Sequence, residues 1–197
     1  MRNLKNNNSS TWRGTLSVRN RLILIIIITV SLYSLLYIAS TIPLSADEIT
    51  SLMEEAEKIL REKYTIMDIF LNNFMISLLM FIPLAGPFIG GYAIYFTGRL
   101  IGALSVSTGV PSILLISMTI ITFYGFIEFL AYGTAFTESI VFTYSIFKKK
   151  SRIESRWLII SIAAVAILLL IAATIEYMLI QFFGQIYPNL EELPAKI

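Results

Sequence analysis

Long apolar runs, separated by short polar or charged segments, dominate the hydropathy pattern of this 197-residue chain. The first run covers residues 22–42, and later runs cover 65–84, 87–108, 111–147 and 157–183. About 20 apolar residues in a helix are enough to cross the hydrocarbon core of a bilayer. A transmembrane β-barrel would instead show short alternating segments. The pattern therefore predicts an all-α, polytopic helical membrane protein.

Residues 45–64 break this pattern, because they are too charged to cross a membrane. Ser45 and Glu48 form the S-x-x-E sequence of a capping box, which predicts that a helix begins here. Apolar side chains then recur at three- and four-residue spacing, as in an amphipathic helix. Acids outnumber bases, so we expect its apolar stripe to pack on the membrane domain or on a partner protein. Three glutamates are the candidate partner-binding residues: Glu54, Glu55 and Glu57.

Basic residues set the predicted orientation of the chain. Five of them precede the first run: Arg2, Lys5, Arg13, Arg19 and Arg21. A second group lies between the last two runs: Lys148, Lys149, Lys150, Arg152 and Arg156. Short loops rich in Lys and Arg stay on the cytoplasmic side. We therefore expect both the N-terminus and residues 148–156 to be cytoplasmic, and the 45–64 helix to be extracytoplasmic.

The run at 111–147 decides the number of crossings. As one helix it would be about 55 Å long, which exceeds one straight span. Gly125 and Gly133 interrupt it, so we expect a re-entrant or broken helix there. This gives five crossings of the cell membrane and an extracytoplasmic C-terminus. Six simple crossings are the alternative, which would place the second basic group outside.

One helical membrane domain at 18–184 follows from this pattern, between polar tails at 1–17 and 185–197. The Asn- and Ser-rich N-terminal tail is expected to be mobile. A cleavable signal peptide is the competing interpretation of the first run. The apolar part of such a peptide is only about 7–15 residues long, so the length favours an uncleaved anchor.

Composition excludes several classes of function. Hydrophobic residues make up 56% of the chain and charged residues 14%, which does not fit a soluble domain. A net charge of +2 gives no indication of a nucleic-acid partner. The chain has no cysteine and no histidine, so thiolate and imidazole metal sites and Ser-His-Asp catalysis are excluded. We expect no enzymatic activity and no cofactor.

Four glycines share one face of the predicted helix at 87–108 and its start, at intervals of four, eight and four residues: Gly86, Gly90, Gly98 and Gly102. Small residues at this spacing let the backbones of membrane helices approach each other closely. We expect these glycines to pack against another helix of the same chain. The alternative is the seam of a homo-oligomer.

Two charges of opposite sign lie inside apolar runs, Arg99 and Glu128. A charge within the bilayer costs several kcal/mol unless it has a partner. We therefore predict an Arg99–Glu128 pair, which is either a structural tie between helices or part of a polar path or ligand site. Glu138 and Glu176 are expected near the two membrane interfaces, where they need no partner.

Short motifs between Asp68 and Thr134 carry a family resemblance. They are Asn72-Asn73 near the start of a run, the glycine-rich segment 86–91, Gly98 with Ile101-Gly102-Ala103, and Tyr124-Gly125-x-x-Glu128. These motifs resemble the stage II sporulation protein M family of bacterial and archaeal membrane proteins, and the isoleucine-rich composition suggests an archaeal member. Family members usually carry Asn-Gly where this chain has Thr97-Gly98, and His-Gly-x-x-Glu where it has Tyr124-Gly125-x-x-Glu128.

The resemblance implies a non-enzymatic membrane component that, in spore-forming bacteria, holds peptidoglycan-degrading partners. We therefore expect a scaffold or assembly component that lies in the lipid bilayer and binds other membrane or extracytoplasmic proteins. The alternative is the membrane subunit of a transporter or exporter, favoured by the broken helix and the two buried charges. The chain has no G-x-x-x-x-G-K-[ST] loop, so an ATPase would be a separate chain.

Overall fold

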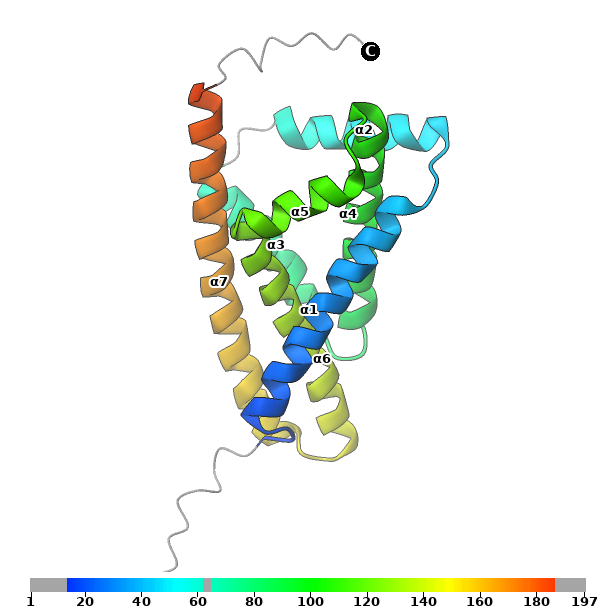
Figure 1. The fold of residues 1–197 in the computed structure, drawn as a ribbon. Coiled ribbons are helices and arrows are strands. Elements are labelled where there is room, and N and C mark those ends of the chain that lie inside the picture. Colours follow the sequence, from blue (N-terminus) through cyan, green and yellow to red (C-terminus); the bar gives the residue numbers. More distant parts are fainter. Residues whose placement is uncertain (1–13, 62–64, 187–197) are drawn as a thin grey trace, which may run out of the picture.

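The computed structural model describes residues 14–61 and 65–186, and the side chains of these residues except 57–61 and 183–186. This part of the chain forms seven α-helices (Figure 1), so the predicted all-α class is confirmed. In chain order they are α1 (Val18–Thr41), α2 (Ala46–Arg61), α3 (Ile66–Met80), α4 (Gly86–Thr108), α5 (Ser112–Ile121), α6 (Tyr124–Phe147) and α7 (Ser151–Ile186).

The long helices form a bundle in which α6 packs against both α1 and α7, while α1 also packs against α4. Helix α3 packs against α7, α4 and α6. Buried apolar side chains from these helices make one core, which includes Leu36, Met80 and Leu169. Helix α2 lies across one end of the bundle, and the turn between α6 and α7 lies at the other end, beside the start of α1 (Figure 1).

Two of the described helices are long and apolar enough to cross a membrane: α1, and α7 over Ser151–Phe182. The α5–α6 pair makes a third span if both helices count as one. These helices indicate a membrane protein, although five crossings are not established. Helix α3 has only 15 residues, about 22 Å, and the 23 residues of α4 include Arg99.

A sharp bend of 87° separates α5 from α6, so the broken helix expected within 111–147 is confirmed. Phe123 takes a left-handed conformation at this bend, with φ 57°. Gly125 follows it, and a Cβ there would collide with the backbone carbonyl of Thr119 in α5. The second expected interruption is wrong, because Gly133 lies inside α6 and packs against Thr29 of α1.

The two predicted tails fall mostly outside the described residues. Residues 14–17 lead into α1, where the Ser17 hydroxyl caps the helix by accepting a hydrogen bond from the Asn20 N–H. At the other end α7 continues to Ile186, two residues into the tail predicted at 185–197.

Candidate functional site

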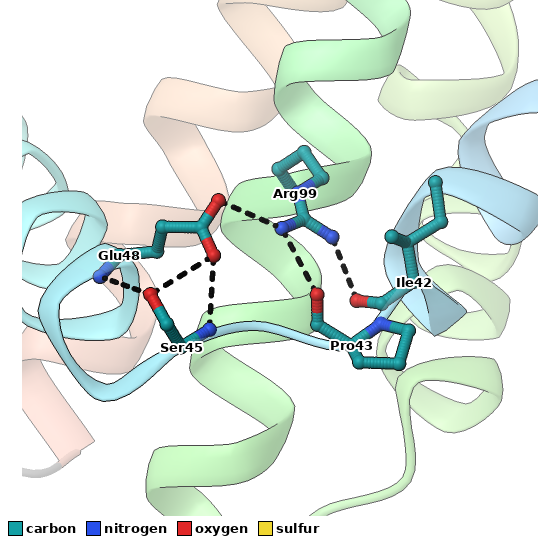
Figure 2. Close-up of polar contacts among 5 residues, drawn as sticks. All are labelled: Ile42, Pro43, Ser45, Glu48 and Arg99. Atoms are coloured by element: carbon teal, nitrogen blue, oxygen red, sulfur yellow. Dashed lines mark hydrogen bonds and ion pairs between the residues drawn. The ribbon is translucent and has the colours of Figure 1, made fainter.

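Arg99 lies at the junction of α1, α2 and α4 (Figure 2), where its side chain is almost completely buried. The guanidinium donates to the carbonyl oxygens of Ile42 at 2.7 Å and Pro43 at 3.2 Å. Ile42 is the C-cap of α1, and the last carbonyls of a helix have no partner within the helix. Arg99 thus satisfies orphan carbonyls where α1 ends, and its charge suits the negative end of the helix dipole.

The same guanidinium lies 3.2 Å from the Glu48 carboxylate, in the first turn of α2. Figure 2 shows Glu48 also accepting hydrogen bonds from Ser45, whose N–H lies 2.9 Å away, while the Ser45 hydroxyl accepts from the Glu48 N–H. The predicted capping box is therefore confirmed. The hydrogen bonds from Ser45, assisted by the charge of Arg99, lower the pKa of Glu48 below its ordinary value.

Helix α2 turns its apolar stripe toward the bundle, and its described acids are exposed, although Glu48 also contacts Arg99. Ile49, Leu52 and Met53 are half-buried, and α2 packs against α4. Of the three candidate partner-binding residues, Glu54 and Glu55 are exposed, and the side chain of Glu57 lies outside the described side chains. The stripe thus packs on the membrane domain, the first of the two expectations, and the acidic face stays open.

Glu128 does not reach Arg99. Its carboxylate accepts a 2.6 Å hydrogen bond from the Asn73 amide of α3, and the Tyr132 hydroxyl donates to the Asn73 carbonyl oxygen at 3.1 Å. The prediction that Arg99 pairs with Glu128 is therefore wrong, because each residue binds other partners. The Arg99 guanidinium binds two backbone carbonyls and Glu48 at the end of the bundle. Backbone carbonyl partners cannot be predicted from the positions of charged residues in the sequence.

Helix α1 contacts α6 close to these residues. Tyr33 of α1 donates to the Gly125 carbonyl oxygen at 3.2 Å and stacks on Phe129 with ring centroids 4.0 Å apart. Glu176 of α7 is half-buried. We call Asn73, Glu128 and Tyr132 the Glu128 site. No cation pairs with Glu128 or Glu176 among the described residues.

The motif residues of the family resemblance divide between this site and its surroundings. Asn73 and Glu128 bond to each other, and Gly125 accepts the Tyr33 hydrogen bond. Tyr124 is half-buried at the start of α6. Asn72 is exposed on α3 and lies outside the site.

A charged cluster that the sequence analysis missed lies at the opposite end from α2. Arg21 of α1 pairs with Glu138 of α6 and, at 2.6 Å, with Glu154 of α7. All three side chains are buried, and the guanidinium lies 5.0 Å from the centre of the Trp157 ring. Glu138 therefore does have a partner, contrary to expectation. The spacing of the sequence could have indicated that Arg21 is buried, because it shares a helical face with Ile25, Ile28 and Leu32.

The four glycines of α4 all face other helices of the same chain. A Cβ on Gly98 would lie 2.6 Å from both the Ala39 Cβ and the Leu36 carbonyl oxygen, and one on Gly102 would lie 2.8 Å from the Ser40 carbonyl oxygen. These contacts bring α4 against the backbone of α1. Gly86 and Gly90 in turn lie against Met80 at the end of α3. The four glycines thus allow α4 to approach both α1 and α3 closely.

No family model, curated protein or solved structure matches this chain. Function is therefore inferred from the two arrangements that the structure builds, the Arg99 junction that positions α2 and the Glu128 site between the helices.

Proposed function

We propose that this protein is a non-enzymatic membrane scaffold whose bundle holds α2 in place for a partner protein. The Arg99 junction carries the proposal. A buried charge is costly in a membrane protein, and here the hydrogen bonds of the Arg99 guanidinium to described residues are made where α1 ends or where α2 begins. The start of α2 is therefore set by α1 and α4 together.

The acidic face of α2 is the proposed partner surface. Glu54 and Glu55 are exposed and make no ion pair among the described residues. Exposed charges of this kind add little to stability, but complementary charge across an interface selects the partner and speeds its association. A helix that is held rigidly and keeps such a face open is suited to binding another protein.

Five crossings are the proposed topology, made by α1, α3, α4, the α5–α6 pair and α7. Both basic groups would then be cytoplasmic, as the preference of Lys and Arg for cytoplasmic loops requires. Support comes from the placement of the start of α1 and the α6–α7 turn at one end of the bundle, with α2 and the end of α7 at the other (Figure 1). The partner of α2 would then be an extracytoplasmic or membrane protein.

Resemblance to the stage II sporulation protein M family supports the same proposal, since it implies a membrane component that holds other proteins. Two residues of the resembling motifs, Asn73 and Glu128, share a hydrogen bond across α3 and α6. This bond gives the motif a role in joining α3 to α6 within the bundle.

A transporter or exporter subunit is the second candidate. The observation that favours it is the Glu128 site, where a half-buried carboxylate between α3 and α6 is bonded to Asn73 and has no cation beside it among the described residues. Intramembrane acids of this kind often mark ion or substrate paths. In that case Glu128, and not α2, would be required for function.

Crosslinking and substitution together separate the two candidates. A photo-crosslinking amino acid at Glu55 should trap a partner in native membranes, whereas the same group at Ile26, exposed on α1, should trap mainly lipid. The triple variant Glu54→Gln/Glu55→Gln/Glu57→Gln should keep its thermal stability and lose the co-purifying partner. An unchanged set of co-purifying proteins in the triple variant would contradict the scaffold. If cells that carry Glu128→Gln lost the activity of the protein while cells that carry the triple variant kept it, the transporter would be favoured.

A further inference from the structure

Exposed bases gather at the end of the bundle opposite α2. They come from the first turn of α1, the α6–α7 turn and the first turns of α7, which lie side by side (Figure 1). We call these six residues the basic end: Arg19, Lys148, Lys149, Lys150, Arg152 and Arg156. At the other end the exposed charges on the described side chains of α2 are acidic.

The acids near the basic end do not neutralise it. Glu138 and Glu154 are almost completely buried, and both carboxylates bind the buried Arg21. Glu154 also accepts a hydrogen bond from the Thr15 N–H. Both carboxylates therefore bind Arg21 inside the bundle and do not pair with the bases of the basic end. The exposed guanidinium and ammonium groups have no acidic partner among the described residues.

Apolar side chains adjoin these bases. Phe147 is 73% exposed directly before Lys148, and Ile153 is 46% exposed between Arg152 and the buried Glu154. The Lys148 ammonium lies 5.5 Å from the centre of the Tyr144 ring. Aromatic and basic residues together are typical of the level where a membrane meets water. A soluble polyanion such as a nucleic acid would leave Phe147 and Ile153 in water, whereas a lipid offers both a negative headgroup and an acyl chain.

We propose that the basic end binds the headgroups of anionic phospholipids in the leaflet that it contacts. The ammonium and guanidinium groups would contact the phosphates, and Phe147 and Ile153 would contact the acyl chains below them. This inference rests on charge and exposure at the basic end, and it does not depend on the scaffold function or on α2.

Each base near an anionic membrane surface contributes about 1 kcal/mol, which is about a five-fold preference. Three lysines together set an upper limit of roughly 100-fold on the loss when they are neutralised. Because the charges are exposed, the preference should fall as salt increases, with a screening length of about 8 Å at physiological ionic strength.

Trp157 provides a reporter at this end, because its ring lies beside Arg21 and the chain has only one other tryptophan, Trp12. In a Trp12→Phe background, the protein would be placed in vesicles that contain either brominated phosphatidylglycerol or brominated phosphatidylcholine, since bromine quenches nearby tryptophan fluorescence. We expect stronger quenching by the anionic lipid at equal content. The ratio of the two lipid-binding constants should exceed one and should fall at high salt.

The decisive variant is Lys148→Gln/Lys149→Gln/Lys150→Gln, in which the ratio should fall by an order of magnitude or more, toward one. Two matched controls should keep the parent ratio: Lys148→Arg/Lys149→Arg/Lys150→Arg, which retains the charge, and Glu54→Gln/Glu55→Gln at the other end. If the glutamine variant does not fold, Arg152→Gln/Arg156→Gln replaces it. Equal quenching by both lipids in the parent, or an unchanged ratio in the neutralised variants, would overturn the proposal.

Discussion

The Arg99 guanidinium lies 3.2 Å from the Glu48 carboxylate, which precedes it by 51 residues and belongs to the first turn of α2. One side chain of α4 thereby holds both the end of α1 and the beginning of α2. The position of α2 consequently depends on the rest of the bundle, so substitutions within the bundle should change the stability of α2.

Replacing Arg99 with Leu should loosen α2. The substitution leaves the carbonyls of Ile42 and Pro43 without their donor, and hydrogen bonds to a charged group contribute about 1.5–3 kcal/mol. We expect a lower thermal unfolding temperature in detergent and faster hydrogen exchange over residues 46–56. Glu48→Gln is the control and should have a smaller effect, because it leaves the carbonyl contacts of Arg99 intact. Unchanged exchange in α2 of the Arg99→Leu variant would contradict its role at the junction.

A double-mutant cycle should show that Arg99 and Glu128 act independently. Because the two residues have different partners, the effects of Arg99→Leu and Glu128→Leu on the free energy of unfolding should add to within about 0.5 kcal/mol. The matched cycle with Asn73→Ala and Glu128→Ala should deviate from additivity by more than that, since these residues share a hydrogen bond. A coupling of several kcal/mol between Arg99 and Glu128 would restore the pair predicted from the sequence.

Two glycines of α4 offer a matched test of close packing. Gly98→Ala places a Cβ 2.6 Å from the Ala39 Cβ, so we expect a loss of about 1–3 kcal/mol from overpacking. Gly91 has no neighbour within 4 Å of such a Cβ. Gly91→Ala should be neutral or stabilising by up to about 1 kcal/mol, because alanine favours the helix. Equal unfolding temperatures for the two variants would show that α1 does not press on Gly98.

Single cysteines should report the orientation of the two ends. We expect a cysteine at Ser51, which is exposed on α2, to react with an impermeant thiol reagent in intact cells. A cysteine at Ser151, beside the second basic group, should react only after the cells are opened, because Lys- and Arg-rich loops stay cytoplasmic. Labelling of Ser151 in intact cells would rule out the five-crossing topology.

Features that depend on local periodicity could be predicted from the sequence. The capping box of Ser45 and Glu48, the stripe of α2 and the break before Gly125 all arise from residues within a few positions of each other. Charge partners could not be predicted in the same way. Arg99 binds backbone carbonyls, which every residue possesses, and Arg21 finds its carboxylates on helices far along the chain. The hydrophobic face shared by Arg21 and Leu32 indicates that Arg21 is buried, but it does not identify Glu138 and Glu154.

The distance along the chain between Arg21 and its carboxylates has a consequence for biosynthesis. Glu138 and Glu154 follow Arg21 by 117 and 133 residues. At about 5–20 residues synthesised per second, roughly 6–23 s separate Arg21 from its first counter-charge. During that interval the Arg21 guanidinium has neither of these carboxylate partners, so we expect α1 to be held less firmly until α6 and α7 have been made. We therefore expect Glu154→Gln to be degraded faster than the parent chain in pulse–chase labelling, because it removes one of the two carboxylates that hold Arg21.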